Sequence, residues 1–310
     1  MLLLSDADVR ACLTMGEAVE AMRDAFARRA AGQMVSAPRS GIEVGGAGLV
    51  WTPGGFLDQM TMGLRLYPTG VERGEQLVAL WDAAGGGLRC LVLGPSLGRM
   101  RTGAIGGVAI DLMAREDAAV LGVIGLGPQA EQQVAAALAV RAIRRIQVFR
   151  RDAALRRRTA AAWAELFGVE VAEANGAEEA SRGADVVVTA TGSRAPVLRA
   201  EWLAPGAHVN SLGPKYRGRQ EIGVDLARRA NLLACDFPEQ YVGEADFFLQ
   251  GTDELARLQD LGALAARGAH RGARDVTLFL SHGLAGTEVR LAQAAYERAR
   301  ALGIGQEIAV

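Results

Sequence analysis

A short glycine-rich turn in the middle of the chain has the spacing of a site for a phosphorylated ligand. The run GLGPQA at 125–130 has the form G-x-G-x-x-A, follows an apolar stretch and opens a helical pattern. Gly125 allows a tight turn, Gly127 lets a pyrophosphate approach the backbone, and Ala130 lets the helix pack closely on the strand. The N–H groups and the positive dipole end of the helix would then bind phosphate. An ordinary strand–helix turn would look similar, but the context favours a dinucleotide site. Its candidate residues are Gly125, Gly127, Pro128, Gln129 and Ala130.

The next predicted strand bears on which dinucleotide is bound. A carboxylate at its end, about 20 residues beyond the turn, would accept hydrogen bonds from the ribose hydroxyls of NAD. The strand at 146–149 instead ends in Arg150 and Arg151, whose guanidiniums suit the 2′-phosphate of NADP. Asp152 follows and could still bind NAD, and the two arginines could simply be solvated. We therefore expect NADP, with NAD as the alternative, and Thr191 as a further contact because it follows a later strand.

Three arginines of the N-terminal part lie beside Gly or Pro residues: Arg39, Arg65 and Arg101. Guanidinium groups can bind a carboxylate with two parallel hydrogen bonds. Arg65 falls inside an apolar run, where a charge is costly unless it is paired. Each of the three, taken alone, is more often a surface or salt-bridged residue. Two acidic residues, Asp82 and Glu288, are expected to be a turn residue and a helix-capping residue.

Lys215 is the only lysine among the 34 lysines and arginines of the chain. An amine can titrate, whereas a guanidinium remains charged. A single lysine in a chain that otherwise uses arginine can therefore mark a place where a proton is exchanged, although it can also arise by chance. His208 and His282 are weaker polar candidates for the same region.

Composition excludes several classes of protein. The 310 residues are half apolar and suffice for two domains, and the formal net charge of −1 argues against nucleic acid or an anionic membrane as partner. The apolar runs are too short for a membrane helix, and charge arrives at Asp6, too early for a signal peptide. Three cysteines without a Cys-x-x-Cys pair, and no ligand spacing of His or carboxylates, predict a cytoplasmic protein without a metal site.

The patterns of apolar residues change along the chain. Residues 6–31 have helical spacing, and between about 35 and 93 short apolar runs separated by Gly and Pro predict a sheet with turns. A helical segment follows at 99–115. From 118 onwards apolar strands alternate with helices, which is typical of parallel β-α-β units. The last helical stretch, 286–302, has no strand after it and could pack back on the N-terminal part.

The sequence resembles the ornithine cyclodeaminase/μ-crystallin family over nearly its whole length. The resemblance is carried by the segments RTGA at 101–104, VIGLGPQA at 123–130, DVVVTAT at 185–191, WLAPGAHVN at 202–210, SHGLA at 281–285 and YERA at 296–299. It implies an α/β fold in which a Rossmann-type doubly wound parallel sheet is inserted into a second, α+β domain. The resemblance places the Rossmann domain at 115–284. It also implies a homodimer, whose substrate-binding and dimerisation domain is formed by 1–114 and completed by 285–310.

The resemblance also implies roles for individual residues. In the family an Arg–Lys–Arg cluster binds the substrate carboxylate, and the matching positions here are Arg39, Arg65 and Arg101. Arg65 stands where the family usually has lysine; we expect it to contribute to catalysis by holding the carboxylate, since it does not deprotonate. Thr102, beside Arg101 in one of these motifs, is expected to contact the cofactor.

Lys215 marks a departure from the cyclodeaminases. Those enzymes have an aspartate two residues after the glycine that matches Gly213, thought to hold the side-chain amine of ornithine. An ammonium at Lys215 would repel a diamino acid. We therefore expect a nicotinamide-dependent oxidoreductase that transfers hydride at the α-carbon of a small imino, keto or amino acid. Lys215 would be its acid/base group, with a pKa lowered by the positive charges of neighbouring arginines and of an oxidised nicotinamide. A cyclodeaminase that recycles NAD internally and a non-catalytic NADPH or ligand binder remain the alternatives.

Overall fold

The computed structural model describes residues 1–72 and 74–309. The chain forms two compact units: the first consists of residues 1–104 and 284–310, and the second of residues 105–283. The second unit is thus inserted into the sequence of the first. The units divide after residues 104 and 283, whereas the sequence predicted boundaries after 114 and 284. The division at 104 falls within helix α3 (Ser96–Met113). Within the described residues, no helix combines the length and the apolar character needed to cross a membrane.

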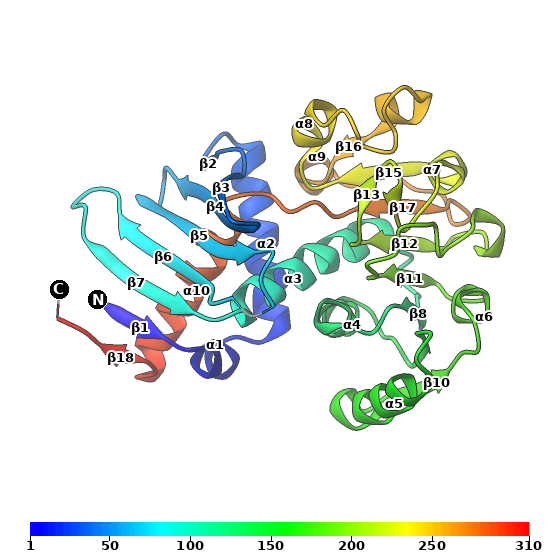
Figure 1. Cartoon of the computed structure of the whole chain (residues 1–310), viewed down its shortest axis with the longest axis horizontal. Coiled ribbons are helices and arrows are strands. Elements are labelled where there is room, and N and C mark those ends of the chain that lie inside the picture. The colour runs from blue at the N-terminus through cyan, green and yellow to red at the C-terminus, as the bar shows by residue number, and fades with distance from the viewer. Residues whose placement is uncertain (73, 310) are drawn as a thin grey trace. The chain divides into compact units, whose positions relative to one another are not determined.

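The first unit contains a mixed sheet (Figure 1). Its strands run in the order β18-β1-β7-β6-β5-β4-β2, and β3 pairs with β4. Neighbours are antiparallel except β1 and β7, which are parallel. The strands are β1 (Leu2–Leu4), β2 (Met34–Ser36), β3 (Ser40–Val44), β4 (Ala47–Phe56), β5 (Thr61–Thr69), β6 (Leu77–Asp82), β7 (Leu88–Leu93) and β18 (Gln306–Glu307). The predicted sheet between 35 and 93 is therefore confirmed, whereas β1 and β18 were too short to give a pattern.

Helices α1 (Asp6–Cys12), α2 (Met15–Ala30) and α10 (Thr287–Leu302) complete the first unit. The expectation of continuous helix over 6–31 was wrong, because a second capping box interrupts it. Thr14 accepts a hydrogen bond from the N–H of Glu17, whose carboxylate accepts one from the N–H of Thr14. The predicted helix at 286–302 is confirmed as α10, which packs against α2 and against β4, β5 and β6.

The second unit contains a parallel sheet with the strand order β10-β9-β8-β11-β12-β17-β15-β16. The chain runs from β8 outward to β9 and β10, then returns to the other side of β8 at β11. This order confirms the doubly wound, Rossmann-type sheet that the sequence predicted. Its strands are β8 (Val120–Ile124), β9 (Arg145–Phe149), β10 (Glu170–Glu173), β11 (Val186–Thr189), β12 (His208–Ser211), β15 (Leu232–Cys235), β16 (Gln259–Asp260) and β17 (Thr277–Leu280).

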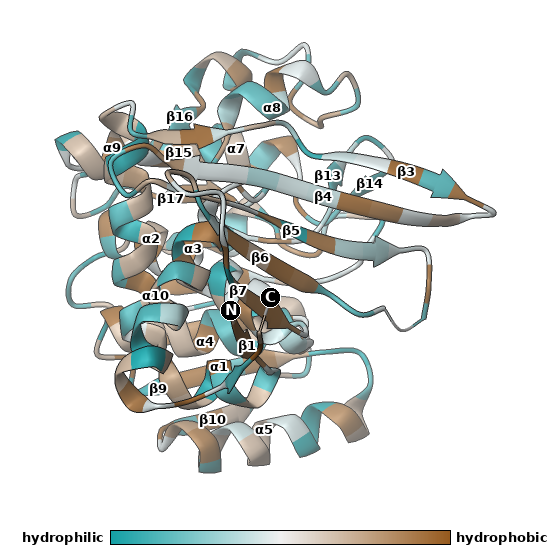
Figure 2. Ribbon diagram, turned by 90° about the vertical axis from the view of Figure 1, so that its left-hand side faces the viewer, coloured by the Kyte–Doolittle hydropathy of each residue, from teal (hydrophilic) through white to brown (hydrophobic). Residues whose placement is uncertain are grey.

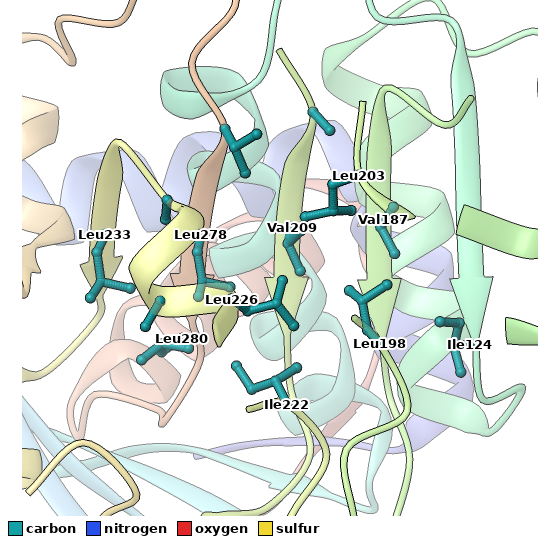
Figure 3. Close-up of a cluster of buried hydrophobic side chains, with 14 of the residues drawn as sticks. Ile124, Val187, Leu198, Leu203, Val209, Ile222, Leu226, Leu233, Leu278 and Leu280 are labelled. Carbon is teal, nitrogen blue, oxygen red and sulfur yellow. The ribbon is translucent and has the colours of Figure 1, made fainter. Parts of the chain in front are cut away.

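Helices cover both faces of this sheet. Successive residues of a strand point to opposite faces, so neighbouring strand residues belong to different core clusters. Val186 and Val188 belong to one core cluster with α4, α5 and part of α3, and Val187 belongs to the other, with α6 and α7. Figure 3 shows this second cluster, in which Leu226 of α7 lies over the strand residues Val209 and Leu278. The remaining elements are α4 (Pro128–Val140), α5 (Ala153–Phe167), α6 (Ala177–Ser181), α7 (Val224–Arg229), α8 (Pro238–Gly243), α9 (Leu261–Arg267), the 3₁₀ turns η1 (Ala200–Trp202) and η2 (Asp253–Arg257), and the short pair β13 (Lys215–Tyr216) and β14 (Arg219–Gln220).

Candidate functional site

A cavity of about 660 Å³ lies in the second unit, at the carboxyl ends of β8, β9 and β11. It is lined by the residues that follow these three strands: 124–127, 149–152 and 190–193, together with Ala177 and Val197. In open α/β sheets, ligands bind where the strand order reverses, and the reversal here lies between β8 and β11. The cavity thus has the position and the size, ~300–1,000 Å³, of a small-molecule site.

The glycine-rich turn forms one wall of this cavity. Gly125 has a φ of +92°, and a Cβ at that position would lie 2.4 Å from the carbonyl oxygen of Ala190. Only glycine fits such a backbone without displacement. Gly127 is the N-cap of α4 and offers no side-chain cap, and a Cβ there would meet no atom within 4 Å. The space beside the helix N-terminus is therefore open, as a diphosphate bound to backbone N–H groups requires.

The other predicted residues of the turn take the places expected of them in α4. Pro128 and Gln129 are exposed in its first turn, and Ala130 is fully buried against the sheet. The N–H of Ala130 donates to the carbonyl of Gly127 over 2.9 Å. Both exposed residues thus lie at the helix N-terminus, and Ala130 allows the close packing of helix and strand.

The end of β9 brings Arg150, Arg151 and Asp152 to the cavity wall. Asp152 is the N-cap of α5, and its carboxylate accepts the N–H of Leu155 over 2.9 Å. This backbone hydrogen bond is the main cause of a lowered pKa of Asp152, despite a small opposing effect of burial. Because the carboxylate already caps a helix, the two arginines are the stronger candidates for contacting a ribose or its phosphate.

A buried glutamate that the sequence did not single out organises two loops at the carboxyl edge of the sheet. Glu221 is fully buried and accepts hydrogen bonds from the hydroxyls of Thr189 and Ser211 and from the N–H of Gly213. It also accepts the N–H and the hydroxyl of Thr191, at 2.8 and 2.9 Å. Thr191 therefore lines the cavity with a hydroxyl that is held by Glu221, and its expected contact with the cofactor remains a prediction.

Lys215 lies in β13, close to the end of β12, and is almost completely buried. Its Nζ donates to the carbonyls of Gly213 and Ser281, at 2.8 and 2.9 Å. Burial lowers the pKa of Lys215 to about 8, partly opposed by the negative charges of Glu221 and Asp236. The low pKa that the sequence suggested is present, but its cause is burial, and the suggestion that neighbouring arginines produce it was wrong.

Two further polar side chains, Tyr241 and Asp236, contact the segment that Lys215 contacts. The hydroxyl of Tyr241 donates to the carbonyl of Ser281 over 3.3 Å, so that it shares this acceptor with Lys215. Asp236 accepts the N–H groups of His282 and Gly283, each over 2.8 Å. The segment that follows β17 is thus held by a buried carboxylate, an amine and a phenol.

The first unit contains the second group of predicted residues, which gather around one carboxylate. Arg101 of α3 and Arg65 of β5 both contact Oε1 of Glu288, at 2.5 and 3.4 Å. Arg65 also donates to Oε1 of Gln76 over 2.7 Å, and its Cζ lies 4.3 Å from the ring centre of Tyr67. The structure therefore brings two of the three predicted carboxylate-binding arginines together.

Glu288 is not the helix cap that the sequence suggested. Gly286 is the N-cap of α10, whereas the Glu288 carboxylate is buried among the guanidiniums. Burial alone would raise its pKa, but Arg101 and Arg65, with smaller help from Arg39, lower it overall. For Arg65 burial is the main cause of a lowered pKa, and Glu288 opposes it. Asp82, in contrast, is the predicted turn residue, because it accepts the N–H of Ala84.

The remaining candidates take different places. Arg39 is exposed between β2 and β3, and Thr102 lies in α3 with its hydroxyl donating to the carbonyl of Gly98 over 3.0 Å. His208 is fully buried between Thr277 and Asn210, and burial lowers its pKa to about 3. A neutral, enclosed imidazole of this kind does not line a cleft. Among residues 1–72 and 74–309, no group of three or more His, Cys, Asp or Glu side chains could hold a metal ion.

Comparison with known proteins places these features in a family. The model of the ornithine cyclodeaminase/mu-crystallin family matches residues 1–303. The chain belongs to this family. Among family relatives, a Δ1-pyrroline-2-carboxylate reductase of Bacillus cereus is 31% identical over 239 residues, which cover 75% of this chain and 73% of the relative.

Solved structures extend the family likeness over the whole chain. The Δ1-pyrroline-2-carboxylate reductase of Thermococcus litoralis, in complex with NADH and L-proline, has a TM-score of 0.91 and 28% identity. That match covers 99% of this chain and 100% of the other. An archaeal alanine dehydrogenase, described as a dimer with bound NAD, has a TM-score of 0.87 and 27% identity, with 100% and 99% covered.

Proposed function

We propose that this member of the ornithine cyclodeaminase/mu-crystallin family is a nicotinamide-dependent oxidoreductase. It transfers hydride at the α-carbon of a small imino, keto or amino acid, as a ketimine reductase or an amino-acid dehydrogenase does. The observation that carries the proposal is the Gly125–Gly127 turn, which opens α4 beside a cavity at the strand-order reversal. The named activities of the pyrroline-carboxylate reductases and the alanine dehydrogenase support it.

The second unit is assigned the cofactor. The turn at Gly125 and Gly127 would hold the diphosphate, and Arg150 and Arg151 would contact the adenosine ribose or its 2′-phosphate. This assignment favours NADP over NAD. A bound nicotinamide would supply or accept the hydride.

The first unit is assigned the carboxylate of the substrate. Arg101 and Arg65 are held in place by Glu288, Gln76 and Tyr67, so that their guanidiniums are ordered before a ligand binds. Arg39 would assist from its exposed segment. Lys215 would hold the exchangeable proton at Nζ, where a pKa of about 8 lets the amine donate near neutral pH.

A panel of substrates tests the proposal. The purified protein is mixed with NADPH or NADH and with cyclic imino acids, pyruvate plus amines, or ornithine. Loss of the reduced-nicotinamide absorbance with an imino or keto acid is the expected result. Release of ammonia from ornithine without net change of cofactor would instead identify a cyclodeaminase. Binding of cofactor with no turnover of any of these compounds would identify a non-catalytic binder.

We further propose that the protein is a homodimer joined through the first unit. An apolar hollow of about 510 Å³ lies on its sheet, lined by residues of β2, β4, β5 and β6. Leu57, Met60 and Met62 are 54%, 47% and 45% exposed there, and exposed apolar side chains that gather in one patch are typical of an interaction surface. Figure 2 shows further hydrophobic residues in the hairpin of β3 and β4, which projects at one end of the sheet.

The assembly is tested by sedimentation of wild type and of the variant Met62→Glu. A dimer for the wild type and a shift toward monomer for the variant are expected, because a buried unpaired carboxylate would oppose association. A monomeric wild type at micromolar concentration contradicts this part of the proposal.

The three cysteines are buried and free, which supports a reducing compartment such as the cytoplasm.

A further inference from the structure

The arginine cluster of the first unit already contains a carboxylate that belongs to the chain. Oε1 of Glu288 lies 2.5 Å from Nη2 of Arg101 and 3.4 Å from Nη1 of Arg65. The three side chains are only 2%, 6% and 16% exposed, respectively. The guanidiniums are therefore partly neutralised before any substrate arrives.

The charges of this cluster do not cancel. Two buried guanidiniums face one buried carboxylate, which leaves an excess of one positive charge. Buried charges are tolerated where they are paired, so this excess suits one further negative charge. Arg39 also acts on Glu288, but it is exposed, and water and salt screen its contribution.

One polar atom of the cluster has unused hydrogen-bonding capacity. Nε of Arg101 is buried and has no hydrogen-bond partner among the described residues. A buried donor without a partner is costly, and a ligand oxygen is one way to satisfy it. The cluster thus combines an excess positive charge with a spare donor.

We propose that Glu288 is a specificity-determining residue that restricts the cluster to substrates with a single carboxylate. The substrate class is then an imino, keto or amino acid with an uncharged side chain. A second carboxylate would be buried near Glu288 with no buried guanidinium left to pair with it, since Arg39 is exposed and screened. This inference rests on the proposed function, because it takes the arginine cluster as the place where the substrate carboxylate binds.

Initial rates with two imino acids test this role. One imino acid is formed from pyruvate and ammonia, and the other, which has a second carboxylate, is formed from oxaloacetate and ammonia. The wild type is expected to prefer the monocarboxylate in kcat/KM. Glu288→Gln frees one guanidinium charge and should shift the ratio toward the dicarboxylate by about tenfold or more. An unchanged ratio in this variant overturns the inference, because a purely structural glutamate would lower both rates alike.

Glu297→Gln is the matched control. Glu297 lies in the same helix, is exposed, and accepts a hydrogen bond from Gln293 over 2.7 Å. The substitution Glu297→Gln removes one negative charge from α10, as Glu288→Gln does, but outside the cluster. It should leave the ratio of the two rates as in the wild type. A shift in this control equal to that of Glu288→Gln would also contradict the inference.

Binding of unreactive acids separates this inference from the proposed function. Propionate and succinate are titrated by calorimetry into wild type and Glu288→Gln. Propionate should bind the wild type more tightly, and succinate should gain relative to propionate in the variant. If the wild type reduces neither imino acid, the proposed function fails, and the acid titration alone decides the role of Glu288. Tighter binding of succinate by the wild type overturns that role.

A second variant covers the case in which Glu288→Gln alone does not fold, because that substitution leaves two buried guanidiniums without a carboxylate. The double variant Arg65→Gln with Glu288→Gln has the same excess of one positive charge as the wild type. It is therefore expected to keep the preference for propionate, although with weaker binding, because a donor is lost. A switch to succinate in the double variant contradicts the charge count.

Discussion

The two candidate binding regions differ in which groups would contact a ligand: backbone N–H groups in one and charged side chains in the other. One wall of the cavity in the second unit is the backbone of the turn at Gly125 and Gly127, which offers N–H groups. The cluster of the first unit is formed by Arg65, Arg101 and Glu288, which come from β5, α3 and α10 and are paired with one another. The cavity is thus defined by a local backbone conformation, whereas the arginine cluster is defined by contacts between residues far apart in the chain. Substitutions should therefore affect the two regions independently.

The largest effect is expected at Lys215, which belongs to neither region. Lys215→Met should lower kcat by about 100-fold or more, because the buried proton donor is lost, and should leave cofactor affinity unchanged. With a pKa of about 8, the protonated amine predominates below that pH, so wild-type imine reduction should slow as the pH rises through it. Lys215→Met and the non-titrating Lys215→Arg should both lack this fall. If Lys215→Met keeps the kcat and the pH profile of the wild type, the amine has no catalytic role and only donates hydrogen bonds to the carbonyls of Gly213 and Ser281.

The same amine gives a stability measurement with a defined sign. Its pKa of about 8 in the folded chain lies below the usual lysine pKa of 10.5. Between these pH values the unfolded chain binds more protons, so the free energy of unfolding should rise with pH across this window. Denaturant titrations of Lys215→Met should show a smaller rise than the wild type over the same range.

Arg101→Ala tests the cluster of paired charges. It should lower kcat/KM for the imino acid by about 100-fold or more, since it removes a guanidinium and leaves Glu288 with one partner fewer. It should also destabilise the protein, by up to ~3–5 kcal/mol. Cofactor affinity, measured by calorimetry, should stay within about twofold of the wild type. Arg298→Ala in the exposed part of α10 is the control. A comparable loss of cofactor affinity in Arg101→Ala would break the separation of the two regions.

Gly125→Ala tests the backbone turn in the same way. Its methyl group would lie 2.4 Å from the carbonyl of Ala190 at a φ of +92°, so the turn must shift. Cofactor affinity should fall by about 10- to 100-fold, while propionate binding to the arginine cluster should be unchanged. Gly176→Ala is the control, because a Cβ there meets no atom within 4 Å and φ is −157°. Unchanged cofactor affinity in Gly125→Ala would remove the turn from the site.

The smallest expected effect concerns the choice of cofactor. Arg150→Ala should weaken NADPH relative to NADH by about tenfold, because the guanidinium would pair with the 2′-phosphate. Dissociation constants for both cofactors, measured at one ionic strength, provide the comparison. Equal weakening of the two would mean that Arg150 does not read the 2′-phosphate.

The same contrast explains what the sequence could predict. The alternation of apolar strands and helices from 118 onwards predicted the parallel sheet, and the spacing of Gly125, Gly127 and Ala130 predicted the strand–turn–helix unit around them. Both are local patterns, set by the periods of strand and helix. The break between α1 and α2 was missed, although Thr14 and Glu17 have the spacing of a capping box.

The missed residues depend on long-range contacts. Glu221 holds Thr191 and Gly213 because β11 and β12 lie side by side, a neighbour relation that no spacing reveals. Glu288 was expected to be a cap because it stands at the start of a helix, and its pairing with Arg65 and Arg101 requires three elements to meet. In the sequence, Glu288 stands one helical turn before the apolar residues Leu291 and Ala292, and this place on the apolar side of the helix is a signal that could have suggested such a pairing.

Calorimetric titration of the purified protein with NADPH and with NADH tests the central claim most directly. The glycine turn, the open helix N-terminus and the cavity at the strand-order reversal predict saturable binding of one dinucleotide per chain, tighter for NADPH. Absence of binding by both cofactors at millimolar concentration would contradict the assignment of this protein as a nicotinamide-dependent enzyme.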